Sequence, residues 1–331
     1  MSIPIVICDD SSFARKQMAR ALPDGCDVEI TFAVDGSEGL TAVKEGKAEI
    51  LFLDLNMPVL DGYETLQAMR DSGLSSKVIV VSGDIQPDAH KRVMDLGATA
   101  FIKKPVSKEE VSKLLRKHGV NVGRKRKKSQ QVSVKTDVRA GCQEIANVAM
   151  GRAADLLARL LNVYINMPIP NVNTIEKNEL RMALSYVDQA SNVSAVCQGF
   201  IGSGIAGEAL LIFDDSNFDD MADLMNYQDH MDDAVQLELL MDISSILISA
   251  FLKGIAEQLD IHFSQGHPNV LGRHIKVADL LKRNISRWDR TLAIETSFSF
   301  EGRDMNCELL FLFTEDSIEP LYKLIAYLLP E

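Results

Sequence analysis

Five polar residues stand where short apolar runs end in the first third of the sequence. Asp9 and Asp10 follow the first run, Asp54 closes the third, Ser82 closes the fourth and Lys104 follows the fifth. Carboxylates gathered in one place repel one another unless a cation joins them. The grouping of three aspartates therefore predicts a divalent ion, most naturally Mg²⁺, which prefers oxygen ligands.

The same residues suit phosphoryl transfer. Asp54 is the candidate nucleophile, Ser82 offers a hydroxyl close to a phosphoryl group on Asp54, and Lys104 offers a point charge to the phosphate oxygens. Each residue alone is weak evidence for such a site. An aspartate at a strand end is more often a helix cap, and a Lys-Pro pair is not specific to any function. Together they predict a phospho-accepting site.

The elements that must position these residues follow from the hydrophobic pattern. Short apolar runs alternate with amphipathic segments of helical period, which implies a parallel sheet with helices on both faces. In such a sheet the site lies at the carboxyl ends of the strands, where the strand order reverses. The apolar runs are 3–8, 28–33, 50–54, 78–82 and 98–102, and the helical segments are 11–22, 36–46, 63–72, 87–96 and 107–117.

Residues 1–118 resemble the CheY-type receiver domain of bacterial response regulators. The segments that carry the resemblance are Ile-Cys-Asp9-Asp10, Leu-Asp54-Leu-Asn56-Met-Pro58, Val-Ser82-Gly83 and Phe101-Ile-Lys-Lys104-Pro105. The resemblance implies a flavodoxin-like, doubly wound, parallel five-stranded sheet and a histidine kinase as phosphodonor. It also implies that Asp9, Asp10, Asp54 and the backbone carbonyl of Asn56 hold Mg²⁺, and that Ser82 and Phe101 couple phosphorylation of Asp54 to a change of surface.

Composition bounds the rest of the chain. A length of 331 residues suits two domains. A net charge of −12 argues against a nucleic-acid partner, and the basic run 124–128 is interpreted as a solvated linker. Scattered cysteines without metal spacing, no signal peptide and no spanning segment predict a cytoplasmic protein with reduced thiols and no membrane insertion.

Three regions are expected: a receiver domain at 1–120, a flexible basic linker at 121–136 and a second domain at 137–331. The second domain shows an approximate internal two-fold repeat, in which a long amphipathic helix precedes a strand pair and a shorter helix. The long helices are expected near 137–163 and 233–259. Long helices over antiparallel strands indicate an α+β domain.

The first of these long helices carries a second candidate site. Glu144 and Asn147 are three residues apart, so both side chains leave the helix on the same side. An amide in mid-helix is not chosen for helix propensity, and Gly151 one turn later weakens the helix. Spacing alone favours an ordinary solvated face with a small residue at a helix crossing.

The segment from Cys142 to Gly151 resembles the signature helix of the CheC/CheX/FliY phosphatases, which dephosphorylate CheY-type receivers. Glu144 and Asn147 match the pattern, and Pro168 or Pro170 lies where the family has a proline, whereas Ala140 departs from the usual leading Asp or Ser. The resemblance implies that Asn147 holds a water and Glu144 pairs with the receiver lysine. It implies an α+β CheC-like fold with an internal pseudo-two-fold repeat.

The second long helix repeats the frame with Glu238, Asp242 and Ser245. Aspartate is one methylene shorter than glutamate and serine has no carboxamide, so this copy is expected to be degenerate, with a weak second site as the alternative. His262, His267 and His274 have no partner cysteines or carboxylates in zinc spacing and are expected at the surface or as caps.

These observations predict a response regulator phosphorylated on Asp54, whose output domain is a hydrolase for aspartyl-phosphate on receivers, in trans or on its own receiver. The expected partners are a histidine kinase and a phosphorylated CheY-like receiver, as in chemotaxis, and a homodimer is allowed. The alternative is a non-enzymatic regulator whose CheC-like domain is a phosphorylation-controlled binding module. A second rival is a DNA-binding regulator that uses the basic run 124–128.

Overall fold

The computed structural model describes residues 2–23, 27–118, 138–176, 192–227, 232–276 and 290–328. The chain divides into two compact units, residues 1–144 and 145–331, and the helix α6 (Val138–Leu161) spans this division. The linker expected at 121–136 lies outside the described residues. Each unit is described by itself.

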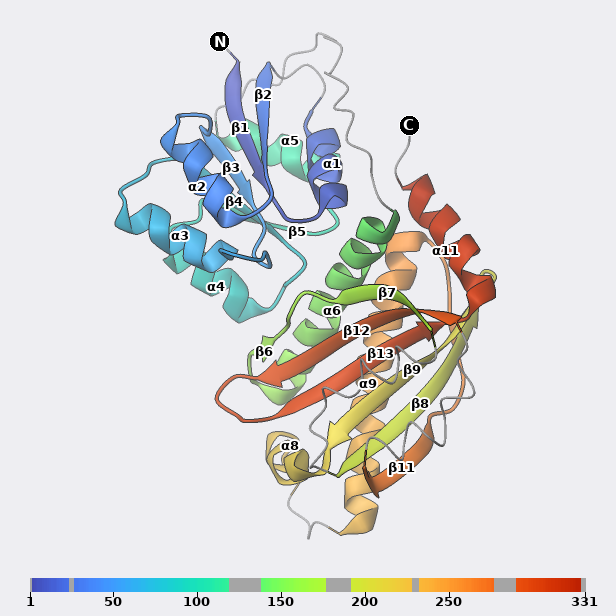
Figure 1. Cartoon of the computed structure of the whole chain (residues 1–331). Coiled ribbons are helices and arrows are strands. Elements are labelled where there is room, and N and C mark those ends of the chain that lie inside the picture. Colours follow the sequence, from blue (N-terminus) through green and yellow to red (C-terminus); the bar gives the residue numbers. More distant parts are fainter. Residues whose placement is uncertain are drawn as a thin grey trace. The chain divides into compact units, whose positions relative to one another are not determined.

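The N-terminal unit is a five-stranded parallel sheet with the order β2-β1-β3-β4-β5 (Figure 1). This is the doubly wound arrangement that the alternating pattern predicts, and its switch point lies between β1 and β3. The strands are β1 Ile3–Cys8, β2 Val28–Ala33, β3 Ile50–Leu53, β4 Lys77–Ser82 and β5 Ala100–Lys103. The helices are α1 Ser12–Ala21, α2 Gly36–Lys44, α3 Gly62–Asp71, α4 Pro87–Asp95 and α5 Lys108–Lys117.

Buried apolar side chains cover both faces of this sheet. Alternate residues of one strand enter different clusters: Val6 packs with Leu51 and Val80 on one face, and Ile7 packs with Phe52 on the other. Side chains of a strand point to opposite faces in turn, so a strand buried on both faces must be apolar throughout. That requirement explains the continuous apolar runs in the sequence.

Local sequence signals set where the helices begin. Ser11 caps α1 through its hydroxyl, which accepts from the Ala14 N–H at 3.2 Å. Asp61 and Glu64 form a reciprocal capping box at the start of α3. These caps satisfy N–H groups that the first turn of a helix leaves without partners.

One turn in this unit is strained. The Leu60 N–H donates to the Pro58 carbonyl at 2.8 Å and closes a three-residue γ-turn around Val59, whose φ is 69°. A positive φ is costly for a β-branched residue, by about 1–3 kcal/mol. The turn lies five residues after Asp54, in the loop between β3 and α3.

The C-terminal unit is an antiparallel sheet with two long helices, α6 and α9 (Asp233–Leu259). The strand order is β10-β8-β9-β13-β12-β6, with β11 paired to β8 and β7 paired to β12. The strands are β6 Ile165–Asn166, β7 Asn171–Glu176, β8 Val193–Gly202, β9 Ile205–Asp214, β10 Ser264–Gln265, β11 Asn269–Ile275, β12 Arg290–Phe300 and β13 Asn306–Phe313. The shorter helices are η2 Asp215–Asn217, α8 Phe218–Leu224 and α11 Glu315–Tyr327.

The described elements of this unit occur twice in the same order. A long helix (α6, α9) is followed by two short strands, then by a long hairpin (β8–β9, β12–β13) and a shorter helix (α8, α11). The β8–β9 hairpin turns on Ser203 and Gly204, which both have positive φ, as a two-residue turn between twisted strands requires. The order of elements agrees with the two-fold repeat that the sequence predicts.

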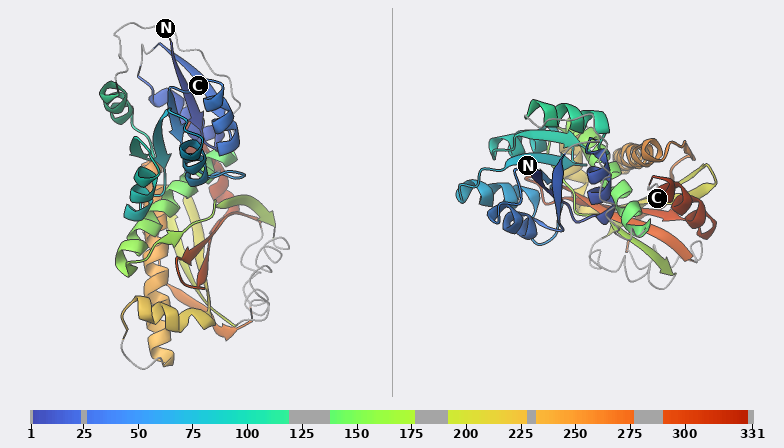
Figure 2. Two further views of the ribbon diagram at one scale, coloured as in Figure 1. Left: turned by 90° about the vertical axis from the view of Figure 1, so that its left-hand side faces the viewer. Right: turned by 90° about the horizontal axis from the view of Figure 1, so that it is seen from above.

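Both long helices lie on one side of the sheet (Figure 2). The ring of Phe251 from α9 stacks on Phe311 of β13 with centroids 4.1 Å apart, and the Thr296 hydroxyl of β12 contacts the Met150 sulfur of α6 at 2.8 Å. The helices cross closely, because a Cβ added at Gly254 would come within 2.7 Å of the Ala149 Cα. The glycine is therefore required by the close approach of α6 and α9.

The helix α9 is long and apolar enough to cross a membrane by length and composition, with a mean hydropathy of 1.7 in its most apolar window. The sequence analysis expected no such segment. However, 61% of that window is buried within the protein, as in the core helix of a globular unit. Packing under the sheet accounts for the apolar character of α9.

Candidate functional site

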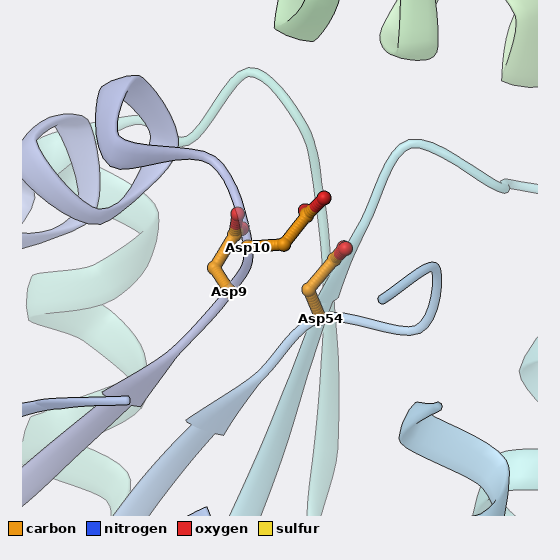
Figure 3. Close-up of side chains that lie close together, drawn as sticks. All are labelled: Asp9, Asp10 and Asp54. Carbon is orange, nitrogen blue, oxygen red and sulfur yellow. The ribbon is translucent and has the colours of Figure 1, made fainter. Parts of the chain in front are cut away.

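The carboxyl ends of β1 and β3 bring the three predicted aspartates together. Asp9 and Asp10 follow β1 and Asp54 follows β3, and one carboxylate oxygen of each lies within 4.8 Å of the others. Figure 3 shows the three side chains converging from the two strand ends. Parallel strands end on the same edge of a sheet, so residues 45 positions apart meet there.

The backbone holds this edge in place. The Asp54 N–H donates to the Cys8 carbonyl at 2.9 Å, which continues the β1–β3 ladder to the site. The Arg15 guanidinium donates to the carbonyl oxygens of Asp9 and Asp10, and the Ser11 N–H donates to Asp9 Oδ1 at 2.8 Å. Arg15 was not among the residues predicted from the sequence, because its only signal is its place on the first turn of the helix after the aspartates.

Lys104 is the cation of the cluster. Its Nζ lies 2.8 Å from Asp9 Oδ2 and 3.1 Å from Asp54 Oδ1, and its side chain is buried. Its backbone N–H donates to the Ser82 carbonyl at 2.9 Å, which ties the end of β5 to the end of β4. The predicted phosphate-contacting lysine thus lies beside the predicted nucleophile.

Burial dominates the electrostatics of these groups. It raises the pKa of Asp54 well above the usual range of a carboxyl, and the nearby Lys104 ammonium offsets this only in part. Burial would lower the pKa of Lys104, but the carboxylates of Asp54 and Asp9 outweigh it and raise that pKa. The lysine therefore stays charged at neutral pH.

The residues fit a magnesium ion. Apart from the ion pair of Oδ1 with Lys104, neither carboxylate oxygen of Asp54 has a hydrogen-bond partner among the described residues, although both are buried. Three carboxylates with one ammonium leave an excess of negative charge and offer the hard oxygen ligands that Mg²⁺ prefers. Asn56 lies two residues after Asp54 in the following loop, and its carbonyl remains a predicted ligand.

The predicted switch residues lie on β4 and β5. Ser82 is buried at the end of β4, and its hydroxyl accepts from the Asp84 N–H at 3.1 Å. Phe101 on β5 is half-buried and packs edge-on against His90 of α4, with ring centroids 5.3 Å apart. The sequence analysis missed His90, because only the fold brings α4 beside β5.

The second candidate pair lies on α6, where Glu144 and Asn147 are one turn apart. Across the part of the chain that the structure describes, no group hydrogen-bonds to the Asn147 carboxamide. The corresponding residues of α9 are Glu238 and Asp242, which are exposed, and Ser245, which is half-buried. The structure therefore places each predicted set on its own long helix.

Several other sequence expectations concern residues away from these sites. His274 pairs with Asp215 at 2.8 Å near the surface. Four cysteines lie within the described ranges; they are buried and form no disulfide there, namely Cys8, Cys142, Cys197 and Cys307. The basic run 124–128 lies outside the described residues.

Comparison with known proteins identifies the N-terminal unit. The profile of the response regulator receiver domain matches residues 5–116. The chain is 33% identical over 104 residues to protein-glutamate methylesterase/protein-glutamine glutaminase 3 of Geobacter sulfurreducens, covering 31% of this chain and 28% of that protein. It covers less than half of the length of such curated relatives.

Two solved structures are similar to parts of the chain. The receiver domain of Thermotoga maritima CheB is 27% identical and covers 35% of this chain and 93% of its own, with a TM-score of 0.32. Thermotoga maritima FliY is 17% identical and covers 59% of this chain and 99% of its own, with a TM-score of 0.45.

Residues 5–116 therefore form the receiver domain of a two-component response regulator. Such a domain takes its phosphoryl group from a histidine kinase and typically binds Mg²⁺ through acidic residues, for which the cluster of Asp9, Asp10 and Asp54 is present.

The Asp10→Asn variant is expected to be more stable than the wild type without Mg²⁺ at pH 7, by about 1 kcal/mol after allowance for solvent screening. Burial, and then the Asp9 carboxylate, raise the pKa of Asp10 from 3.8 to about 6. A folded pKa above the unfolded value means that ionisation of Asp10 costs stability as pH rises from about 4 to 6.

Melting curves at pH 7 with and without Mg²⁺ measure this effect. The wild type should gain stability on addition of Mg²⁺ and the variant should gain much less, and Mg²⁺ binding to the wild type should weaken below pH 6. Equal gains in the two proteins would show that Asp10 is not a ligand.

Proposed function

We propose that the C-terminal unit hydrolyses aspartyl-phosphate on receiver domains and that Glu144 and Asn147 of α6 carry the reaction. The observation that supports this most is the pair itself. A carboxylate and a carboxamide leave the same side of one long helix, and the carboxamide has no hydrogen-bond partner among the described residues. Its donor and acceptor are thus available to a water molecule.

The reaction asks little of the enzyme. An aspartyl-phosphate is a reactive acyl phosphate, so a water attacks phosphorus, the bond to the aspartate oxygen breaks, and carboxylate, inorganic phosphate and a proton are released. Asn147 orients the water in line with the bond that breaks. Glu144 docks the helix by pairing with the lysine of the substrate receiver. Where the substrate is this chain's own receiver, Asp9, Asp10, Asp54 and the Asn56 carbonyl would hold a Mg²⁺ ion, which would neutralise phosphate charge.

The helix α9 does not support an equal role in hydrolysis. In α9, Asp242 stands in the place of Glu144 and Ser245 in the place of Asn147. The shorter carboxylate has less reach, and the hydroxyl cannot offer a separate donor and acceptor in the geometry of an amide. The α9 copy is therefore inactive or a weak second site.

The receiver gives this activity a control. Phosphorylation of Asp54 regulates the output unit, which acts on a phosphorylated receiver of another protein. Its own receiver is the other candidate substrate, since the receiver and the output unit belong to one chain. A phosphorylation-controlled binding module without activity is the alternative.

The decay of phosphate on the full-length chain tests the proposal. The protein is labelled at Asp54 with ³²P-phosphoramidate, freed of donor, and followed over time. The double variant Glu144→Ala/Asn147→Ala is expected to keep its phosphate about tenfold to a hundredfold longer than the wild type. The matched control Asp242→Ala/Ser245→Ala on α9 should decay like the wild type.

A mixing experiment separates the two modes of action. The ³²P-labelled double variant serves as substrate, and wild-type chain that carries unlabelled phosphate on Asp54 serves as enzyme, so that the proposed control by phosphorylation is satisfied. Faster decay in the mixture indicates action between molecules, and decay that is fast only in the wild type indicates action within one molecule. Equal decay of wild type and double variant in every arrangement would contradict the phosphatase and favour the binding module.

A further inference from the structure

The γ-turn after β3 carries an exposed apolar side chain. Val59 stands at its centre with φ 69°, and 83% of its surface is exposed. A side chain so exposed makes few contacts within the protein. The packing free energy of Val59 therefore offsets little of the strain in its backbone.

The turn does not depend on the valine. The Gly62 N–H donates to the Leu55 carbonyl at 2.9 Å, and the Gly36 N–H donates to the Leu60 carbonyl at 3.1 Å. These backbone bonds tie the loop to the end of β3 and to the first residue of α2, at the end of the loop between β2 and α2. Glycine or asparagine would adopt the same conformation with less strain. The side chain at position 59 therefore serves something other than the fold.

A second exposed apolar residue stands on the loop to which this turn is tied. Val34 follows β2 and is 42% exposed, two residues before Gly36. Both loops leave the carboxyl ends of parallel strands, so Val34 and Val59 lie on the same edge of the sheet as Asp54.

We propose that Val59, supported by Val34, is a contact for the histidine-bearing surface of the kinase that phosphorylates Asp54. A protein donor must bring its phosphohistidine to bonding distance of the Asp54 carboxylate, and its surface then covers the neighbouring loops. Burial of an apolar side chain at the edge of such a contact is favourable in free energy. This gain offsets the strain of the turn. A small phosphodonor reaches Asp54 without covering Val59.

The test compares a protein donor with a small one on full-length chains. The protein donor is a ³²P-labelled, autophosphorylated histidine kinase selected because it phosphorylates the wild type. The small donor is phosphoramidate, which has the same P–N bond as phosphohistidine. The variants are Val59→Asn and Val59→Gly, which relieve strain and remove the apolar contact, and Val59→Met, which keeps an apolar side chain without β-branching.

Val59→Asn and Val59→Gly are expected to lower the rate of transfer from the kinase about tenfold and to leave the phosphoramidate rate within about twofold of wild type. They should also melt about 2–4 °C higher, because the turn is relaxed. Val59→Met should transfer like the wild type. Three results overturn the proposal: an unchanged kinase rate, an equal fall with both donors, or a loss in Val59→Met as large as in Val59→Asn.

Discussion

Replacing Lys104 with alanine is expected to destabilise the receiver by about 3 kcal/mol at pH 7 in the absence of Mg²⁺. The substitution removes the ammonium that lies 2.8 Å from an Asp9 oxygen and 3.1 Å from an Asp54 oxygen. Two buried carboxylates would then face each other without their cation. Loss of one partner from a buried ion cluster costs more than the cluster contributes, because the remaining charges stay buried.

The sign of the pH dependence follows from the direction of the shift. The pKa of Lys104 is raised in the folded protein, above an ordinary value of 10.5. Its contribution is therefore fully present at neutral pH and is lost only above the ordinary lysine pKa. Acidification should reduce the difference in the free energy of unfolding between wild type and Lys104→Ala, since protonated carboxyl groups no longer repel each other.

Calorimetry of the full chain measures this loss of stability. The thermal transition that Mg²⁺ shifts is the one to compare, because it belongs to the receiver. Lys103→Ala is the matched control, because this adjacent lysine is exposed and its loss should change stability by no more than about 0.5 kcal/mol. Equal stability of the two variants would mean that the ion cluster does not hold the folded site together.

Replacing Gly254 with valine is expected to destabilise the C-terminal unit by about 3 kcal/mol. A Cβ at this position would lie 2.7 Å from the Ala149 Cα and 2.9 Å from its Cβ. The obstacle is the backbone of α6, which no rotamer change can move away. Gly254→Ala should lose less, because a gain of about 1 kcal/mol in helix propensity opposes the clash.

Urea unfolding of the full chain, followed by circular dichroism, checks this prediction. Lys253→Ala is the control, because it changes the neighbouring exposed residue of the same helix. If Gly254→Val unfolded at the same urea concentration as this control, the close crossing of α6 and α9 would be wrong.

The receiver was predictable because its chemistry stands at strand ends. Asp54, Ser82 and Lys104 each follow a continuous apolar run, and the parallel sheet brings such ends to one edge. The long hairpins of the C-terminal unit were also found, since they are apolar and flanked by glycine. The short strands β6, β7, β10 and β11 were not, because segments such as Asn171–Glu176 alternate polar residues and owe their pairing to the neighbouring strand.

The conformation of Val59 could not be predicted. Nothing in a Pro-Val-Leu sequence favours a positive φ, and valine argues against it. The backbone hydrogen bonds of the loop impose the turn, and they join residues from three segments of the chain. Similarly, the edge contact of Phe101 with His90 depends on the docking of α4 on the sheet.

The crossing of α6 and α9 has a consequence for protein engineering. The helix that bears Glu144 and Asn147 also bears Ala149, which must fit against Gly254 of the partner helix. A designer who grafts the proposed reacting pair onto a new scaffold cannot transfer α6 alone. The unit to transfer is the pair of crossed helices with Gly254 retained. The close approach at this glycine sets how α6 lies against α9, and so how the pair is oriented.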